Sequence, residues 1–392
     1  MKKFKLRKLL SIAFLIMILP ATVLLTSCDQ NDSKFLKTCV YEIIDDFTNI
    51  SLNTDEADVT VLPSDDEKCR VICKEKNNQK HEVTISDKTL SINMINSRKW
   101  YNYIFSFGSQ KIDIYIPESE YENLSINDNT GDIEIGKDFS FASINIKVNT
   151  GDVKNYASVV GKIVIDGGTS DIYVENVSAD SLECYNSTGD IHISSVTLKN
   201  ELKIDGSTTN IFLNDIKCDS LSSNSGTSDI TASSLICNQD TNVKIGTGKK
   251  KFNDVNCKNF TVDSGTGDIE IIDVITSELL SVTGTTSDIN AKSCNAADIY
   301  IKTGTGDVEA NNVIASNLLS IIGNTCDVNI ERCDGTEIYI KTGTGDVMGS
   351  ILSEKIFITK TNTGKIEAPP CLTGGKCEIT VGTGKIIIEI VD

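Results

Sequence analysis

Ten aspartates recur from residue 132 onward, separated by 19, 20 or 39 residues. Carboxylate oxygens are the ligands that calcium prefers, so an evenly spaced row could form an acidic ridge that binds cations or a basic polymer. Aspartate is also a common turn residue, because its side chain satisfies nearby backbone N–H groups. The sequence leaves both interpretations open. If the aspartates do bind calcium, the affinity is expected to be low and the binding spread along the row, because each repeat offers one carboxylate. The aspartates are Asp132, Asp152, Asp171, Asp190, Asp229, Asp268, Asp288, Asp307, Asp327 and Asp346.

A repeated threonine stands two places before each of these aspartates and marks a template of 19 or 20 residues. Gly or Asn precedes it in most repeats, which predicts a tight corner with positive φ at that position. Aliphatic residues lie six and four places before it and three places after it, and a spacing of two puts residues on one face of a strand. The fourteen threonines are Thr130, Thr150, Thr169, Thr188, Thr208, Thr227, Thr247, Thr266, Thr286, Thr305, Thr325, Thr344, Thr363 and Thr383.

A fixed period near 20 residues is the signature of a solenoid, because one repeat cannot bury its apolar face alone and must stack on its neighbours. We therefore predict an all-β fold, an elongated single-stranded parallel β-solenoid (β-helix), right-handed, with about fourteen regular turns of 19–20 residues. One repeat places Lys250 at an inward position. We expect a local bulge there, because Phe252 keeps the next inward place, and a lysine that snorkels outward is the alternative.

Three of the thirteen cysteines, Cys218, Cys237 and Cys257, share one template position. Stacking would bring neighbours to about 5 Å, within reach of a disulfide, although a column of small corner residues is the alternative. Cys69 and Cys73 share a strand face about 13 Å apart, too far to bridge. Without a CxxC pair or a histidine partner, no metal tetrad is predicted. Four further cysteines replace Ile, Leu or Val and are predicted to be core residues: Cys184, Cys294, Cys333 and Cys377.

Catalytic signatures are scarce. The two histidines are His81 and His192, and no GxSxG, HExxH or phosphate-binding loop is present. His192 falls at an outward strand position, where a solvated side chain is the simplest interpretation. A polysaccharide-acting β-helix enzyme would need a dense cluster of Asp with Arg or Lys, and Arg332 is the one arginine after residue 120. We therefore predict that the protein is not an enzyme and has no cofactor beyond weakly bound calcium.

The N-terminus has the pattern of an export signal. Basic residues in MKKFKLRK precede the apolar run LLSIAFLIMILPATVLL, and LTSC follows at Leu25–Cys28. This pattern predicts a bacterial lipoprotein signal at residues 1–27, with lipid attached to Cys28 after cleavage. An uncleaved anchor helix is the alternative, although the run is short for a span and contains Pro20. In either case the chain would be held at the cell membrane, outside the cytoplasm.

Residues 28–34 then form a tether, residues 35–120 a less regular N-terminal β cap, and residues 121–392 the solenoid. Alternating segments such as HEVTISDKTLSIN predict strands in the cap, and the aromatic-rich residues 96–109 are expected to cover the lower end of the solenoid. The C-terminal KIIIEIVD has no cap. Its last strand is therefore predicted to present an open apolar edge that supports end-to-end self-association.

The formal net charge is −18. Five basic residues lie in the signal segment, so the chain that follows it is more acidic than the whole. An acidic surface repels the phosphate backbone, so nucleic acid is not a predicted partner. Such a surface attracts cations and basic partners instead.

The segments SLNTDEADVTVLPSDDEKCRV and KIDIYIPESEYENLSINDNTGDIEI, followed by serial TGD[IV] units, resemble a bacterial envelope family known as putative adhesins, a domain of unknown function. The resemblance covers about residues 40–392 and implies a β-strand-repeat fold without assigned catalytic residues. It implies an adhesin that binds an unknown envelope or host surface ligand. Some relatives lie beside envelope stress systems, so an accessory or sensor of an envelope stress response is the alternative.

Overall fold

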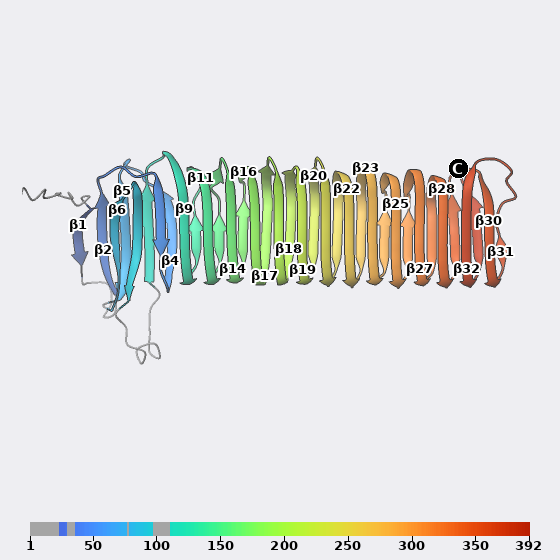
Figure 1. The fold of residues 1–392 in the computed structure, drawn as a ribbon, viewed down its shortest axis with the longest axis horizontal. Helices are drawn as coiled ribbons and strands as arrows, with labels where there is room; N and C mark the ends of the chain where they lie inside the picture. The colour runs from blue at the N-terminus through green and yellow to red at the C-terminus, as the bar shows by residue number, and fades with distance from the viewer. Residues whose placement is uncertain (1–22, 30–35, 77, 97–109) are drawn as a thin grey trace, which may run out of the picture.

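The computed structural model describes residues 23–29, 36–76, 78–96 and 110–392, and all structural statements below concern these residues. They form strands and connecting turns, stacked into a long rod (Figure 1). Successive strands pair in parallel through most of the rod, which confirms the predicted parallel β-solenoid. Within the described residues, no helix is long and apolar enough to cross a membrane.

The regular coils run from the strand after the N-terminal region to the far end of the rod. Their strands are β9 (Glu120–Thr130), β10 (Ile133–Ile135), β11 (Ser140–Thr150), β12 (Val153–Asn155), β13 (Ser158–Val159), β14 (Lys162–Thr169), β15 (Ile172–Glu175), β16 (Ser178–Ala179), β17 (Ser181–Leu198), β18 (Glu201–Cys218), β19 (Ser220–Thr227), β20 (Ile230–Cys237), β21 (Asp240–Thr247), β22 (Lys250–Thr266), β23 (Ile269–Thr286), β24 (Ile289–Lys292), β25 (Asn295–Thr305), β26 (Val308–Asn311), β27 (Ile314–Thr325), β28 (Val328–Thr344), β29 (Val347–Ile351), β30 (Lys355–Thr363), β31 (Ile366–Glu367), β32 (Gly375–Thr383) and β33 (Ile386–Ile390).

The repeated threonines pair with one another in register, for example Thr150 with Thr169 and Thr305 with Thr325. Aliphatic side chains on both sides of each threonine point inward and are buried, so like residues stack on like through the rod. Ile133, Val153 and Ile172 form one such buried column. This stacking closes the core that a single repeat could not bury alone.

The corner is tight, but its positive φ was predicted at the wrong residue. The left-handed conformation belongs to the glycine after the threonine, as at Gly306 with φ of 126°. The glycine before the threonine has no positive φ and is needed for space instead: a Cβ on Gly304 would lie 2.5 Å from the Thr285 carbonyl oxygen of the previous coil. A second corner, in most of the coils, has positive φ at a non-glycine residue such as Asn176.

Lys250 is neither bulged out nor turned to solvent, so the predicted bulge is wrong. It pairs in register with Ile230 and Ile269 and is 1% exposed. Its amine bends toward the corner and donates to the carbonyl oxygens of Gly248 at 2.5 Å and Thr266 at 2.8 Å, and to Ser264 Oγ. Burial lowers the pKa of Lys250, and these acceptors make the buried amine tolerable. Phe252 is fully buried at the next inward place, as predicted.

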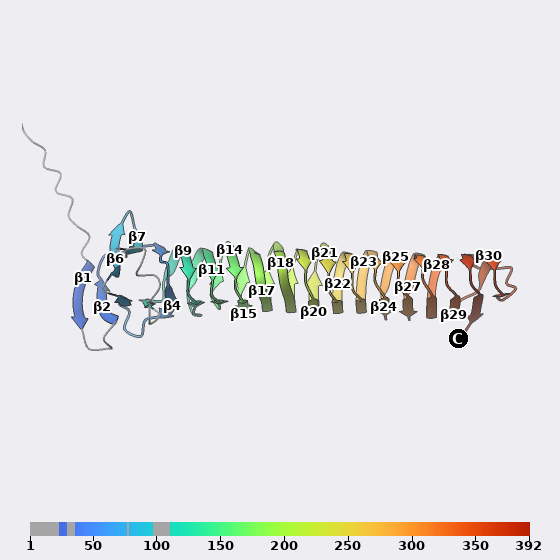
Figure 2. The same ribbon diagram turned by 90° about the horizontal axis from the view of Figure 1, so that it is seen from below.

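The N-terminal region contains both coils and a cover. Strands β3 and β4 pair in parallel with β9 and β10, and β7 and β8 pair in parallel with β3 and β4, so two further coils precede the regular array. Strands β5 and β6 lie antiparallel against β8 and β7, and β2 and β1 continue outward (Figure 2). The aromatic segment predicted to cover this end lies largely outside the described residues. The bounds are β1 (Val23–Asp29), β2 (Leu36–Ile43), β3 (Asn49–Asn53), β4 (Ala57–Pro63), β5 (Cys69–Lys76), β6 (Gln79–Ser86), β7 (Thr89–Asn96) and β8 (Gln110–Ile116).

The last strands of the chain are not the end of the rod, so the prediction that KIIIEIVD forms an open edge is wrong. Strand β32 pairs with β28 on one side and β30 on the other, and β33 lies likewise between β29 and β31. Ile388 is 4% exposed as a result. The outermost coil is β30–β31, and among the described strands it pairs on one side. The chain end is fixed nearby, where Arg332 donates to the Asp392 carbonyl oxygen at 2.5 Å.

Candidate functional site

The predicted aspartates do form a row along one corner of the solenoid, and the row is bound together through the backbone. Asp132 Oδ1 accepts a hydrogen bond from the Asp152 N–H at 2.9 Å, and Asp307 Oδ1 accepts one from the Asp327 N–H at 2.9 Å. Each rung joins one coil to the next. The turn interpretation of these residues is therefore the one that the hydrogen bonds support. Eight of the ten predicted aspartates accept such a backbone bond, and Asp190 accepts one from the Asn210 side chain instead. The eight are Asp132, Asp152, Asp171, Asp229, Asp288, Asp307, Asp327 and Asp346.

Residues that looked like interruptions in the sequence continue the row. Asn210 donates its amide to Asp190 Oδ1 at 3.0 Å and accepts from the Asp229 N–H at 3.2 Å. The first rung comes from the N-terminal region, where Asp58 accepts from the Asp132 N–H at 3.2 Å. The remaining predicted member is Asp268. The preceding coil has Lys249 at this template position, so no carboxylate is available there to accept a hydrogen bond from the Asp268 N–H. Binding of calcium along the row stays a prediction.

The cysteines divide much as expected. Cys184, Cys294, Cys333 and Cys377 are at most 1% exposed and serve as core residues, as predicted. The Cys218 and Cys237 thiols are free and buried, with their sulfurs 3.3 Å apart. Their hydrogen bond and burial raise the pKa of Cys218. The structure thus favours a column of small corner residues over a disulfide at this position.

A buried polar cluster that was not predicted lies in the N-terminal cap. Cys73 and Glu75 point inward from β5, and His81 points inward from β6, the next strand, which follows β5 around a corner. The three side chains are at most 3% exposed, and their ligand-type atoms all lie within 4.8 Å of one another. Glu75 Oε2 is 3.4 Å from His81 Nδ1. Sequence spacing did contain a signal, since period-two alternation places Glu75 and His81 on the face of buried Val71 and Val83.

The partners of this cluster leave one atom unsatisfied. The His81 N–H donates to Glu75 Oε2 at 2.7 Å, and Thr54 Oγ1 lies 3.3 Å from His81 Nε2. Buried His81 Nδ1 has no hydrogen-bond partner among the described residues. Cys39, which is disulfide-bonded, lies 3.5 Å from Glu75 Oε1 through its sulfur. A carboxylate, a thiol and an imidazole therefore share a dry space with incomplete hydrogen bonding.

The electrostatic field in this cluster is negative. Burial, Glu75 and Asp113 together raise the pKa of the Cys73 thiol. Burial and Glu75 likewise raise the pKa of Tyr41 to about 12, and the Tyr41 hydroxyl donates to the His81 carbonyl oxygen at 3.1 Å. Burial is the larger cause of both shifts and disfavours a charge of either sign, whereas the carboxylates of Glu75 and Asp113 disfavour a further negative charge and favour a cation.

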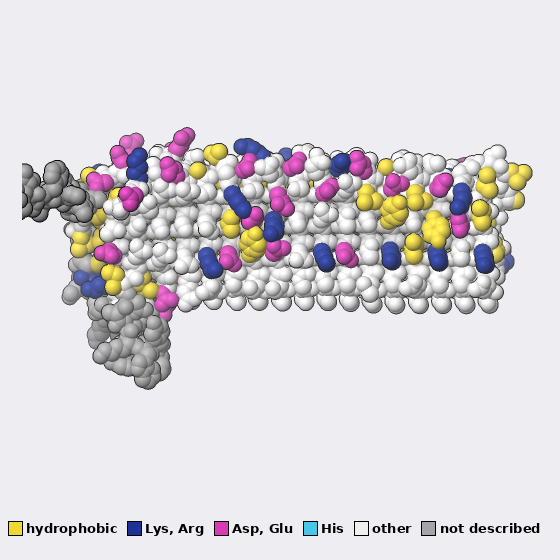
Figure 3. All heavy atoms as spheres, in the orientation of Figure 1, with side chains coloured by type: hydrophobic (Ala, Val, Ile, Leu, Met, Phe, Trp, Pro, Cys, Tyr) yellow, Lys and Arg dark blue, Asp and Glu magenta, His cyan; other side chains and the backbone are white. Residues whose placement is uncertain are grey.

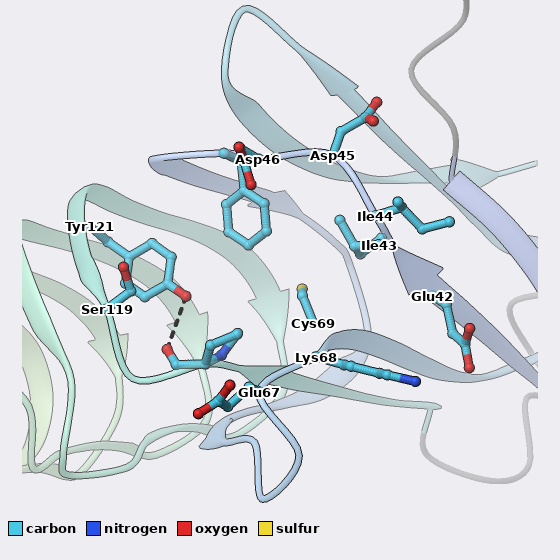
Figure 4. A pocket seen from close by; sticks show the side chains of 12 residues that line it. Glu42, Ile43, Ile44, Asp45, Asp46, Glu67, Lys68, Cys69, Ser119 and Tyr121 are labelled. Atoms are coloured by element: carbon cyan, nitrogen blue, oxygen red, sulfur yellow. Dashed lines mark hydrogen bonds between the residues drawn. The ribbon is translucent and has the colours of Figure 1, made fainter.

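A cleft of about 530 Å³ lies beside the cap (Figure 4). Its floor contains Ile43, Cys69 and Tyr121, and the Tyr121 hydroxyl donates to the Pro117 carbonyl oxygen at 3.0 Å. Its rim is acidic, with Glu42, Asp45, Asp46 and Glu67 against Lys68. The cleft could admit a group with an apolar body and a positive charge.

The long faces of the rod are shallow. Figure 3 shows one of them as an extended surface on which lysine side chains recur in a line and hydrophobic side chains gather in patches. His192 points outward, as predicted, with its side chain 35% exposed. It is stacked between Tyr173 and Phe212, with ring centroids 4.8 and 4.6 Å away. The rings cover one another's faces, so they offer mainly edges to a ligand.

The backbone of Cys28 lies in β1, in register with Cys39 of β2. Residues 1–22, which hold most of the predicted export signal, are outside the described part of the chain. Cleavage before Cys28 would remove Val23–Ser27 from β1 and leave β2 as the outer strand of the cover. Lipid attachment at Cys28 stays a prediction.

Several solved structures resemble the chain. One is a putative cell adhesion protein from Clostridium sporogenes, with 13% identity, a TM-score of 0.30, and coverage of 46% of this chain and 99% of the other. A putative adhesin from Bacteroides fragilis has 14% identity, a TM-score of 0.21, and coverage of 91% and 98%. A putative lipid binding protein from Parabacteroides distasonis has 17% identity, a TM-score of 0.23, and coverage of 80% and 95%.

No curated protein matches the chain in sequence. The model of one protein family matches it twice, over residues 47–207 and 202–368. The two matches together span the coils from β3 to the outermost coil, β30–β31. On this basis, the chain belongs to the Toastrack DUF4097 family.

Proposed function

We propose that the protein is a membrane-anchored, extracytoplasmic β-solenoid that acts as an adhesin, without enzymatic activity. The observation that carries this proposal is the difference between the two ends of the rod. Antiparallel strands cover the end near the N-terminus, whereas the outermost coil at the other end pairs on one side among the described strands. A rod held at its covered end presents its open end away from the membrane.

The open end has the chemistry of a contact surface. Ile366 points inward from β31 but is 42% exposed, because no further coil stacks on it, and Leu372 in the following loop is 92% exposed. The unpaired backbone edge of β30 can accept another strand. This end is not strongly apolar, because its inward positions include the polar residues Thr359 and Thr361. The following loop also contains Pro369 and Pro370.

A second copy of the chain is the proposed occupant of this end. Two β30 edges can pair about a two-fold axis, which makes the contact self-complementary and closed. With the anchor at the opposite end, tail-to-tail pairing would connect rods from two facing membranes. If this end instead binds an unrelated envelope or host ligand, that ligand replaces the second copy as the occupant.

The anchor is tested by feeding cells a clickable fatty acid and comparing Cys28→Ala with the unchanged protein. Label in the unchanged protein and none in the variant is expected. Equal label in both would overturn the lipid anchor and leave the question of the open end unaffected.

The open end is tested by sedimentation of the full chain over a range of concentrations. The unchanged protein is expected to form dimers, and the double variant Ile366→Lys, Leu372→Lys is expected to remain monomeric. Ile236→Lys is the matched control, because Ile236 is 49% exposed in the middle of the rod. A monomer at all concentrations, or equal dimerisation of both variants, would contradict the proposed pairing.

A further inference from the structure

We propose that Cys73, Glu75 and His81 form a zinc site that fixes the corner between strands β5 and β6 of the N-terminal cap. Thiolate, carboxylate and imidazole are the three ligand types that zinc uses in proteins. The ligands come from both sides of this corner, where β5 and β6 share the single pair Lys76 and Gln79, and the two strands pack antiparallel on β8 and β7 of the outermost coil. A metal bound to both strands would hold the corner in the shape that fits over β7 and β8.

The distances fit the ion with a small adjustment. Two ligand atoms of a tetrahedral zinc, each about 2.0–2.1 Å from the metal, lie about 3.3 Å apart. Glu75 Oε2 and His81 Nδ1 are already 3.4 Å apart. The Cys73 sulfur lies within 4.8 Å of both other ligand residues, so a change of side-chain torsion brings it into range. Cys39 is not a proposed ligand, because it does not belong to the group whose ligand atoms all lie within 4.8 Å of one another.

The hydrogen bonds around the site match those of a metal-bound histidine. Zinc on Nδ1 would satisfy the atom that lacks a partner. It would also fix the tautomer with the proton on Nε2, which can then donate to Thr54 Oγ1 at 3.3 Å. An outer partner of this kind orients the ring and raises its affinity for metal.

The site differs from an ordinary buried ion pair between Glu75 and His81. An ion pair would leave the Cys73 thiol without a role, although its sulfur lies within 4.8 Å of the ligand atoms of both charged residues. Zinc binding replaces the proton of Cys73: the S–H bond breaks, the S–Zn bond forms, and the proton passes to solvent. Because the ligands are at most 3% exposed, metal must enter while β5 and β6 are lifted from the coil beneath them, so binding is coupled to closure of the cap.

The test uses the full chain, stripped of metal and titrated with Co²⁺ as a spectroscopic substitute for zinc. We expect a thiolate-to-cobalt charge-transfer band that zinc abolishes, and a melting temperature that zinc raises by on the order of 5 °C over matched magnesium. Cys73→Ser and His81→Gln should each remove the band. Cys69→Ser is the matched control, because Cys69 is a buried thiol on the same strand and face.

Absence of the band in the unchanged protein would overturn the proposal. A band that survives in both Cys73→Ser and His81→Gln would do the same, because it would belong to an adventitious metal elsewhere. If Cys73→Ser does not fold, Glu75→Gln takes its place, and a band of full intensity in that variant and in His81→Gln would reject the site.

Discussion

At the N-terminal end of the rod, the outermost coil β7–β8 lies under antiparallel strands, whereas at the C-terminal end the coil β30–β31 is paired on one side among the described strands. A parallel coil always offers its backbone edge to another coil. Antiparallel strands use up that edge in a geometry that the solenoid cannot continue, so they end its growth. The contrast shows that antiparallel strands close one end, while the other end carries polar side chains and proline at an open edge.

Both ends nevertheless share one device. The first coil in the chain, β3–β4, lies one place inside β7–β8, and the last coil, β32–β33, lies one place inside β30–β31. Each terminal coil is therefore paired on both sides. A terminal coil with two neighbours frays less readily than one with a single neighbour, because stability in a solenoid comes from nearest-neighbour contacts.

Disrupting the cover should produce the largest effect, because it makes the N-terminal end open as well. Val71 is fully buried on β5 and faces β8, and Val71→Asp would bury a carboxylate without a partner. We expect a loss of roughly 3–5 kcal/mol in the free energy of unfolding of the cap, and new association through the exposed β8. Ile72→Asp, on the opposite face of the same strand, is the control. Denaturant unfolding and sedimentation measure both, and equal behaviour of the two variants would show that β5 does not cover this end.

The two ends should respond to pH in opposite directions. Burial raises the pKa of Asp128 to about 7, with a further increase from Asp55 and Asp58 that the Asn129 and Thr130 N–H groups oppose. A raised pKa means that the folded state binds the extra proton. The stability from Asp128 is therefore complete below its ordinary pKa of 3.8 and is lost as pH rises to about 7.

Asp334, near the other end, has the reverse behaviour. Burial opposes its ionisation, but hydrogen bonds from Lys355, Ser353 and the Gly335 N–H outweigh burial and lower its pKa. Its stability is present above pH 3.8 and is lost as pH falls through the lowered pKa. As the pH falls from 7 to 4 we therefore expect the hydrogen-exchange protection factors of β9, corrected for the intrinsic exchange rate, to rise by an amount worth roughly 2–4 kcal/mol, and those of β28 to change little. Asp128→Asn should abolish the pH dependence of protection in β9. An unchanged pH dependence in this variant would contradict its assignment to Asp128.

Insertion of the last coil should depend on two glycines. A Cβ on Gly375 would lie 1.8 Å from the Thr336 carbonyl oxygen, and one on Gly374 would lie 1.8 Å from that of Glu354. Gly375→Ala should cost roughly 1–3 kcal/mol and expose β32 and β33 to protease. Gly136→Ala is a milder control near the other end, because its Cβ would be 3.0 Å from the nearest backbone atom. Equal protease resistance of both variants would mean that the inserted position of β32 is wrong.

Periodicity along the chain was enough to predict the coils, because each coil obeys the same local rule of inward aliphatics and a tight corner. It could not predict the order of the coils at the ends. Residues 355–367 and 375–390 have the same template whichever of the two coils is outermost. The order of these coils is shown only by backbone contacts such as that of Gly375. Lys250 was misplaced for a related reason: its three acceptors come from the corner and from the next coil, which no pattern of apolar residues reveals.

The candidate site shows the same limit. The aspartate row could be found by spacing alone, because its members occupy one template position. The cluster of Cys73, Glu75 and His81 could not, since it lies at the corner between β5 and β6, which follows no repeated template. Alternation predicts which residues point inward, but it does not predict that the chain bends between Glu75 and His81 and brings them together.

Calcium should have the smallest effect. The response to calcium would show whether the aspartate row binds cations or only stabilises the corners of the coils. Oδ1 of most of these aspartates is held by a backbone N–H, which leaves Oδ2 for an ion. At a calcium concentration equal to its dissociation constant, the gain is about 0.4 kcal/mol, or a rise of about 0.5 °C in melting temperature over sodium at matched ionic strength. Asn210 shows that asparagine keeps the rung, because its side-chain oxygen accepts from the Asp229 N–H. Changing Asp288, Asp307, Asp327 and Asp346 together to asparagine therefore removes charge and preserves the hydrogen bonds. That variant should lose the response to calcium, and it should melt higher than the unchanged protein without calcium, since four like charges about 5 Å apart repel. No response in the unchanged protein would assign the row to corner stability alone.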